Sequence, residues 1–126
     1  MTTQINFEPS PWIVKNLKNI SKNCNILDLA CGYGRHSIYA KKIGLNVTAA
    51  DIDYEKLFYL KNVHNITVLR LDIEKKFNWP FKKNIFDHAI SRFGVMFFEY
   101  PLRAFTHTNQ ALKKDGSFTF VCWRHF

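Results

Sequence analysis

Several features that would assign a protein class at once are missing from this sequence. The cysteines Cys24, Cys31 and Cys122 are odd in number and include no Cys-x-x-Cys pair, which argues against a disulfide framework and a structural zinc site. No metal-ligand spacing links the histidines to one another or to the cysteines, so no metal ion is expected. No apolar run approaches the roughly 20 residues that span a bilayer, and residues 1–10 lack a signal-peptide pattern. We therefore expect a cytoplasmic protein with no membrane partner.

Acidic residues are also scarce, because 10 Asp and Glu stand against 18 Lys and Arg, for a formal net charge of +8 at pH 7. Such an excess can indicate a nucleic-acid partner. The lysines, however, occur as scattered pairs at expected helix ends and turns, where cations suit the helix dipole or solvate the surface. We interpret them as surface residues and keep nucleic acid as an alternative partner. The pairs are Lys41-Lys42, Lys75-Lys76, Lys82-Lys83 and Lys113-Lys114.

A chain of 126 residues can bury roughly two thirds of the surface that its unfolded form exposes, which is enough for one core. We therefore expect a single domain over residues 1–126. Apolar strand patterns alternate with helix patterns along it, which predicts a mainly parallel sheet with helices on both faces. The expected strands are 25–29, 46–50, 66–71, 86–91 and 117–123, and the expected helices are 12–20, 34–43, 54–61 and 102–113, with an irregular crossover around 78–81.

A small-residue loop follows the first expected strand and opens a helix. Ala30, Gly32 and Gly34 let a ligand approach the backbone closely, and the helix aims its free N–H groups at the same place. The next two strands each end in an acid, Asp51 and Asp72. In a parallel sheet Asp51 would lie beside the loop, where its carboxylate can accept two ribose hydroxyls. The pattern indicates a nucleotide-like ligand.

At these motifs the chain resembles the class I S-adenosylmethionine-dependent methyltransferases, from about Ser10 to Arg124. The resemblance is carried by Leu-Asp-Leu-Ala-Cys-Gly-Tyr-Gly at 27–34, Val47 to Asp51, Leu71-Asp72, Phe86-Asp87 and residues 111–116. It implies a three-layer Rossmann-like fold, S-adenosyl-L-methionine as cofactor and a methyl-transfer reaction. The chain departs from the family pattern at Ala30, which replaces a glycine, and at Lys114-Asp115-Gly116, which lacks the usual proline.

The resemblance also implies which residues contact the cofactor. It places four loop positions around the methionine part, Asp51 on the ribose hydroxyls and Ile52 against the adenine. Asp72 would accept from the adenine amino group, with Ile73 at the cofactor as well. The loop positions are Asp28, Ala30, Gly32 and Gly34.

The methyl acceptor is not identified by the sequence, and no catalytic residue can be named. The substrate-pocket candidates are Arg92, which could hold an anionic group, and Phe93, which could wall the pocket. An Asn/Asp-Pro-Pro-Tyr/Phe sequence is missing at this point, which favours a small molecule over a nucleic-acid base. We interpret Cys31 as a small residue that fits the turn, and His36 as a helix-surface or pocket-wall residue.

Beside the fifth strand, the resembled family has two further strands. The resemblance therefore predicts a C-terminally shortened member or a fragment whose last two strands are missing. Strand 117–123 would then be an edge with unpaired backbone groups, through which the chain could associate with itself.

Two other functions stay open. A nicotinamide-dependent oxidoreductase would use the loop and Asp51 similarly, but its fingerprint wants a third glycine where this chain has Ser37. A non-catalytic cofactor-binding remnant or partner subunit would keep the binding acids without turnover. Titration with S-adenosylmethionine, S-adenosylhomocysteine and NAD separates these alternatives.

Overall fold

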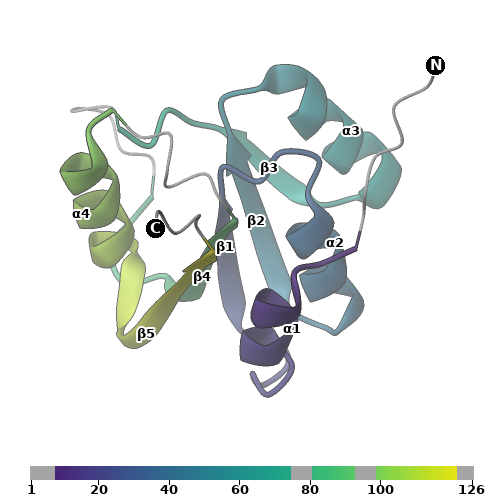
Figure 1. The fold of residues 1–126 in the computed structure, drawn as a ribbon, viewed down its shortest axis with the longest axis horizontal. Helices are drawn as coiled ribbons and strands as arrows, with labels where there is room; N and C mark the ends of the chain where they lie inside the picture. The colour runs from purple at the N-terminus through teal and green to yellow at the C-terminus, as the bar shows by residue number, and fades with distance from the viewer. Residues whose placement is uncertain (1–7, 75–80, 93–98, 122–126) are drawn as a thin grey trace, which may run out of the picture.

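A computed structural model describes residues 8–74, 81–92 and 99–121 (Figure 1). No helix in these ranges is both long enough and apolar enough to cross a membrane. The helices are α1 (Pro11–Leu17), α2 (Arg35–Lys42), α3 (Tyr54–His64) and α4 (Pro101–Ala111), and the strands are β1 (Asn25–Leu29), β2 (Asn46–Asp51), β3 (Thr67–Arg70), β4 (Phe86–Arg92) and β5 (Leu112–Val121).

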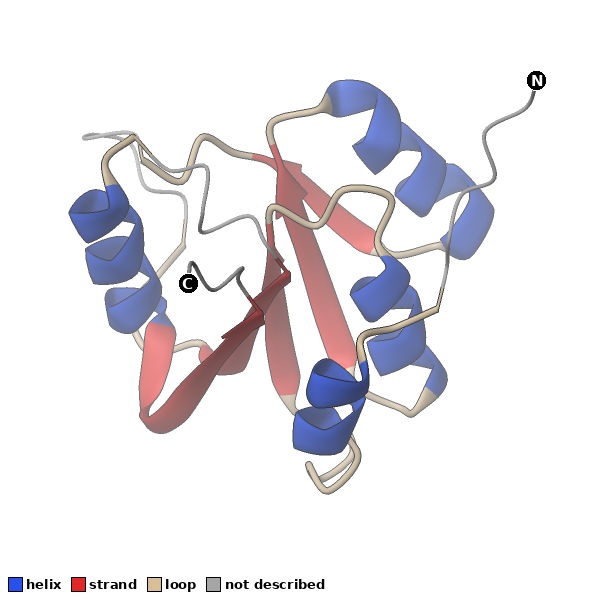
Figure 2. Cartoon of the chain, viewed as in Figure 1, coloured by secondary structure: helices blue, strands red, loops and turns tan. Residues whose placement is uncertain are grey.

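The strands form one five-stranded sheet in the order β3-β2-β1-β4-β5, and each neighbouring pair is parallel. Helices α1, α2 and α3 lie on one side of the sheet and α4 on the other (Figures 1 and 2). The predicted Rossmann-like α/β fold is thus confirmed. Because the chain leaves β1 toward β2 and later returns to β4 on its other side, the strand order reverses between β1 and β4. Ligands of open α/β sheets bind at the carboxyl ends of the strands at such a reversal.

Alternation along β1 divides the core between the two faces of the sheet. Ile26 packs with Ile13 of α1 and Ala40 of α2. Leu27 and Leu29 point the other way and join a cluster that includes Ala104 and Ala111 of α4. A strand buried on both faces reads as a continuous apolar run, which is why β1 could be predicted with both ends correct.

Several helix ends differ from the sequence-based expectation. Helix α3 continues to His64 rather than Lys61, because Asn65 adopts the left-handed conformation (φ 53°) that ends helices. Helix α1 ends at Leu17 rather than Ile20. Helix α4 ends at Ala111 and leads directly into β5, which starts at Leu112 rather than Ser117, because Leu112 is already extended and pairs with Phe86. The expected crossover around 78–81 and Trp123 lie mostly or wholly outside the described residues.

Asp87 joins the starts of three strands. Its Oδ2 accepts a hydrogen bond from the backbone N–H of Asn25 (2.7 Å) in β1, and its Oδ1 pairs with Lys113 Nζ (3.1 Å) in β5. The hydrogen bond from Asn25, aided by Lys113, holds the pKa of the Asp87 carboxyl below its usual range. The Phe-Asp motif noted in the sequence therefore secures the sheet in the described structure.

Candidate functional site

The loop between β1 and α2 turns sharply at the carboxyl end of the sheet. Ala30, Gly32 and Gly34 all adopt positive φ values of 51°, 57° and 80°. Cys31 donates its N–H to Ala50 O of β2 (3.1 Å), and Gly34 donates its N–H to Cys31 O (2.9 Å). The loop is thereby held against β2, with α2 starting directly behind it.

The two glycines of this loop serve different purposes. A Cβ at Gly34 would lie 2.3 Å from Leu60 Cδ2 of α3, so only glycine lets α3 pack this closely. A Cβ at Gly32 would meet nothing within 4 Å. Gly34 thus supports packing, and Gly32 presents its bare backbone to open space. The sequence did not reveal this difference, because the contact depends on Leu60, which is distant in the chain.

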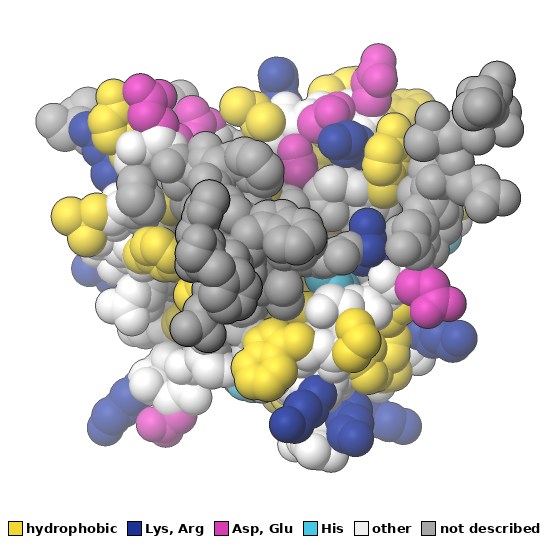
Figure 3. Space-filling view, viewed as in Figure 1, with side chains coloured by type: hydrophobic (Ala, Val, Ile, Leu, Met, Phe, Trp, Pro, Cys, Tyr) yellow, Lys and Arg dark blue, Asp and Glu magenta, His cyan; other side chains and the backbone are white. Residues whose placement is uncertain are grey.

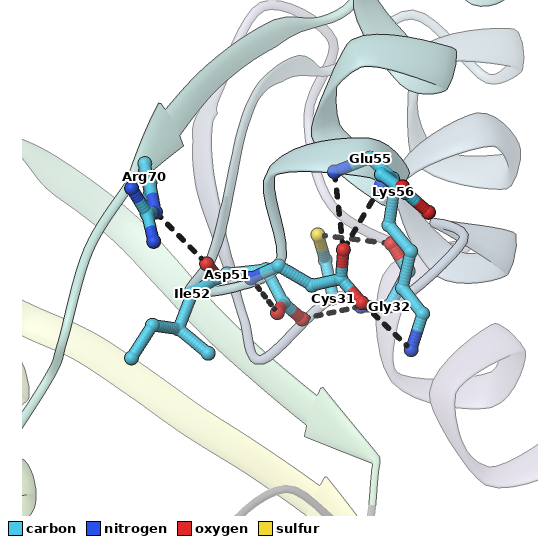
Figure 4. Close-up of polar contacts among 8 residues, drawn as sticks. Cys31, Gly32, Asp51, Ile52, Glu55, Lys56 and Arg70 are labelled. Carbon is cyan, nitrogen blue, oxygen red and sulfur yellow. Dashed lines mark hydrogen bonds and ion pairs between the residues drawn. The ribbon is translucent and has the colours of Figure 1, made fainter.

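Asp51, the last residue of β2, holds the loop and the start of α3 together (Figure 4). Its Oδ2 accepts from Gly32 N–H (2.8 Å) and its Oδ1 from Asp53 N–H (2.9 Å). Each carboxylate oxygen keeps capacity for a further hydrogen bond. Asp53 in turn caps α3, because its Oδ1 accepts from Glu55 N–H (3.1 Å) and Lys56 N–H (3.4 Å). The predicted proximity of Asp51 to the glycine loop is confirmed.

The residues after β2 and β3 extend this edge. The Ile52 side chain is 60% exposed, and its carbonyl oxygen accepts from Arg70 Nε (3.0 Å), which fixes the backbone there. Asp72 is exposed, and its Oδ1 accepts from Glu74 N–H (3.0 Å). Ile73, by contrast, is 8% exposed and belongs to the core cluster on the α4 side. The sheet edge therefore presents Asp51, Ile52 and Asp72 to solvent, but the Ile73 side chain faces the core.

Asp28 lies behind the loop and is 2% exposed. Its Oδ2 accepts a hydrogen bond from Ser37 Oγ (2.6 Å) of α2. Burial raises the pKa of the Asp28 carboxyl from 3.8 to about 7, although hydrogen bonds from Ser37 oppose the shift. Ser37 stands where a dinucleotide fingerprint would have its third glycine, and here its hydroxyl serves Asp28 instead.

Cys31 and His36 do not form a nucleophile pair. Burial raises the pKa of the Cys31 thiol far above its usual range, which suppresses the reactive thiolate. His36 was expected on a helix surface or in a pocket wall, and this expectation was wrong: it is buried, and its Nε2 accepts from Ser10 N–H (3.0 Å). His36 thereby ties the chain before α1 to α2. Within the described residues, no group of three or more His, Cys, Asp and Glu could hold a metal ion.

Ser91 is a residue that sequence reasoning did not single out for a role. It is fully buried near the end of β4, and its Oγ donates to Leu29 O (2.9 Å) at the end of β1. This bond joins the two strands at which the strand order reverses. A small polar residue ending an apolar strand was the available signal. The side chain of Arg92 and all of Phe93 lie outside what the structure describes, so the substrate-pocket prediction stays untested.

Comparisons with known proteins agree with this arrangement. A family model described as a methyltransferase domain matches residues 27–120. An uncharacterized protein from Methanocaldococcus jannaschii is 36% identical over 104 residues, which are 82% of this chain and 39% of that protein.

Solved structures give the same picture. The chain is similar to an S-adenosylmethionine-dependent methyltransferase from Mesorhizobium loti, with 28% identity and a TM-score of 0.71 over 79% of this chain and 46% of that one. It shares its fold with a TehB-like methyltransferase from Corynebacterium glutamicum, with 24% identity and a TM-score of 0.71 over 86% and 61% of the two chains. The chain thus spans less than two thirds of the length of each of these proteins.

Proposed function

Because the chain belongs to the methyltransferase domain family, we propose that it binds S-adenosyl-L-methionine and supports transfer of its methyl group to a small-molecule acceptor. The observation that carries the proposal is the Asp51 carboxylate, which lies at the carboxyl end of β2 and hydrogen-bonds the open glycine loop.

The residues present suit the proposed cofactor. The ribose hydroxyls are donors, and Asp51 can accept them bidentately. Gly32 leaves open space where a side chain would otherwise stand, and exposed Ile52 offers an apolar surface for the adenine ring. Asp72 would take the adenine amino group. Gly34 and Asp28 support the loop from behind, and Ile73 contributes through the core beneath it.

The bound cofactor supplies an electrophilic methyl group on a sulfonium, whose leaving sulfide needs no protonation. The chain's part in such a reaction is to fix geometry. Asp51, the glycine loop and the Ser91 bond between β1 and β4 form a rigid seat at the point of strand reversal. Holding two reactants at near-attack distance can supply effective molarities of about 10⁵ M or more. A general base is needed only if the acceptor must lose a proton.

The charge of this edge supports a small molecule as acceptor. Asp51, Asp53, Glu55 and Asp72 all follow β2 or β3 at the carboxyl side of the sheet. Acidic side chains gather along the upper edge of Figure 3, where these segments lie. A polyanionic acceptor would be repelled there, because nucleic-acid binding relies on cationic side chains that neutralise phosphates.

Calorimetric titration of an Asp51 variant tests the proposal. Asp51→Ala should weaken S-adenosylhomocysteine binding by about 1.5 to 3 kcal/mol, the range for losing hydrogen bonds to a charged group. Since Asp51 also accepts from Gly32 and Asp53, Asp51→Asn should give an intermediate loss. Asp115→Ala is the control, because it removes an exposed carboxylate from the opposite edge of the sheet.

Unchanged affinity in a folded Asp51→Ala protein would remove the ribose role. Tighter binding of NAD than of S-adenosylhomocysteine by the wild-type chain would favour the oxidoreductase alternative. Binding without methyl release across a broad acceptor panel would favour a non-catalytic binding domain.

A further inference from the structure

One face of the molecule carries charge of a single sign. Between residues 9 and 50, Asp28 is the only acidic residue, and it is buried. Lysines and an arginine occur in the same stretch at positions 15, 18, 22, 35, 41 and 42. The nearest acid in the sequence, Glu8, lies at the border of this face, where Arg35 Nη1 contacts its carbonyl oxygen (3.4 Å).

Four of these lysines, which we call the basic surface, lie close together: Lys15, Lys18, Lys22 and Lys42. Helices α1 and α2 pack on the same side of the sheet through a shared core cluster. The segment after α1 lies beside the end of α2, because Asn23 N–H donates to Gly44 O (2.9 Å). The aliphatic stem of Lys22 also lies against Gly44, with its Cγ 3.3 Å from the position that a Gly44 Cβ would occupy.

The lysines of the basic surface are not committed to structural bonds in the described part of the chain. All four are exposed. The ion pairs described there, Lys56 with Asp53 and Lys113 with Asp87, lie elsewhere. Lys41 differs and is left out of the surface, because its Nζ donates to His64 O (3.1 Å) and Asn65 O (2.5 Å) at the end of α3.

An exposed aromatic ring lies next to these charges. Trp12 is 49% exposed, and Lys15 Nζ lies 5.7 Å from the centroid of its ring. Nucleobases stack on such rings while neighbouring lysines contact the phosphates. In Figure 3 dark blue side chains gather along the lower edge, around α1, whereas magenta side chains lie along the upper edge.

We propose that the basic surface, together with Trp12, binds single-stranded nucleic acid. An anionic membrane fits the face less well, because an interfacial helix must offer an apolar face to the lipid. The apolar residues Ile13 and Leu17 of α1 are fully buried in the core instead. Helix α1 lies at the lower end of Figure 1, away from the loop that follows β1, so the nucleic acid is a docking partner rather than the methyl acceptor.

Fluorescence anisotropy with a labelled single-stranded RNA of about 15 nucleotides tests the proposal. Contacts from four lysines should give a slope of log affinity against log salt of about −3, at about 0.7 per phosphate. Lys15→Glu/Lys18→Glu should weaken binding about tenfold or more and flatten this slope by about 1.4. Trp12→Ala should weaken binding at least about fivefold through lost stacking.

The matched control is Lys82→Glu/Lys83→Glu, which changes the net charge by the same amount. Lys82 and Lys83 are exposed and lie on the α4 side, since the neighbouring Asn84 and Ile85 donate N–H groups to Gln110 O and Ala111 O at the end of α4. This control should lose less than about threefold, as a change of net charge alone would. Lys15→Gln/Lys18→Gln serves as a milder second variant if the Glu variant is poorly folded.

Equal losses in both charge-reversal variants would overturn the proposal, because net charge rather than this surface would then explain binding. Salt-independent or undetectable RNA binding would also overturn it. So would a Lys15/Lys18-dependent association with vesicles of phosphatidylserine and phosphatidylcholine that exceeds the association with RNA.

Discussion

Two carboxyl groups beside the same loop meet opposite environments. Asp51 is half-exposed and accepts two backbone N–H groups, so its carboxylate can serve a ligand. Asp28 is buried, with Ser37 hydroxyl as a partner, and its pKa is raised to about 7. The sequence shows both as acids within one motif. Only the fold separates them, because burial depends on how α2 covers the back of the loop.

This burial predicts that Asp28 makes stability fall with rising pH. The native state keeps the Asp28 proton up to about pH 7, whereas the unfolded chain loses it near 3.8. The native state therefore binds more protons between these values, and the free energy of unfolding should fall by roughly 2–4 kcal/mol across them. Asp28→Asn should remove that fall.

Urea unfolding at about pH 5 and about pH 8 checks this prediction by the difference between wild type and variant. The comparison isolates Asp28 from His88, whose pKa is lowered by burial and whose contribution runs in the opposite direction. Asp115→Asn is the exposed control. An Asp28→Asn protein with the same pH dependence as wild type would show that Asp28 is already ionised at low pH.

At the scale of elements, sequence periodicity and end signals predicted most of the architecture. The β1 run, Asp53 as the cap of α3 and Gly44 after α2 are local signals, and the structure confirms them. Packing that joins distant segments could not be predicted. The direct passage from α4 to β5 depends on pairing with β4, and the Gly34 contact depends on Leu60. The site followed the same rule, because Asp51 was found but Ser91 was not.

Gly34→Ala should separate α3 from the loop. Its Cβ would lie within 3 Å of three Leu60 side-chain carbons, at a φ of 80°. We expect a loss of about 2–4 kcal/mol in the free energy of unfolding, from overpacking and left-handed strain together. Gly32→Ala should lose only about 1–2 kcal/mol, because it has the strain without the clash.

A double-mutant cycle with Leu60→Ala isolates the packing part of this effect. Chemical unfolding of the four proteins should show that Gly34→Ala adds little once Leu60 is shortened. Full additivity of the two losses would mean that the Leu60 contact does not explain the need for glycine.

At the scale of the whole molecule, the sheet is open along β5. This strand pairs with β4 on one side, and among the described residues no strand pairs with its other side. Phe118 and Phe120 of β5 form an aromatic group with Phe105 of α4, and Phe120 is 41% exposed. An edge with exposed aromatic side chains invites pairing with another chain.

We therefore predict that this chain self-associates through β5. Sedimentation velocity should show dimers or larger species whose share rises with concentration. Phe120→Lys should shift them toward monomer, because a charge on an edge strand opposes pairing. Thr106→Lys is a control that places the same charge at an exposed position of α4. A wild-type monomer at all concentrations would contradict the prediction.

The central claim is that the cofactor lies at the carboxyl edge, over Gly32 and Asp51. The most direct test follows backbone amide signals by NMR while S-adenosylhomocysteine is added to the wild-type chain. The account predicts that the largest shifts fall on Gly32, Asp51, Ile52 and Asp53, with little change at Lys15 and Lys18. Unchanged signals throughout the glycine loop, or largest shifts at the opposite edge of the sheet, would contradict it.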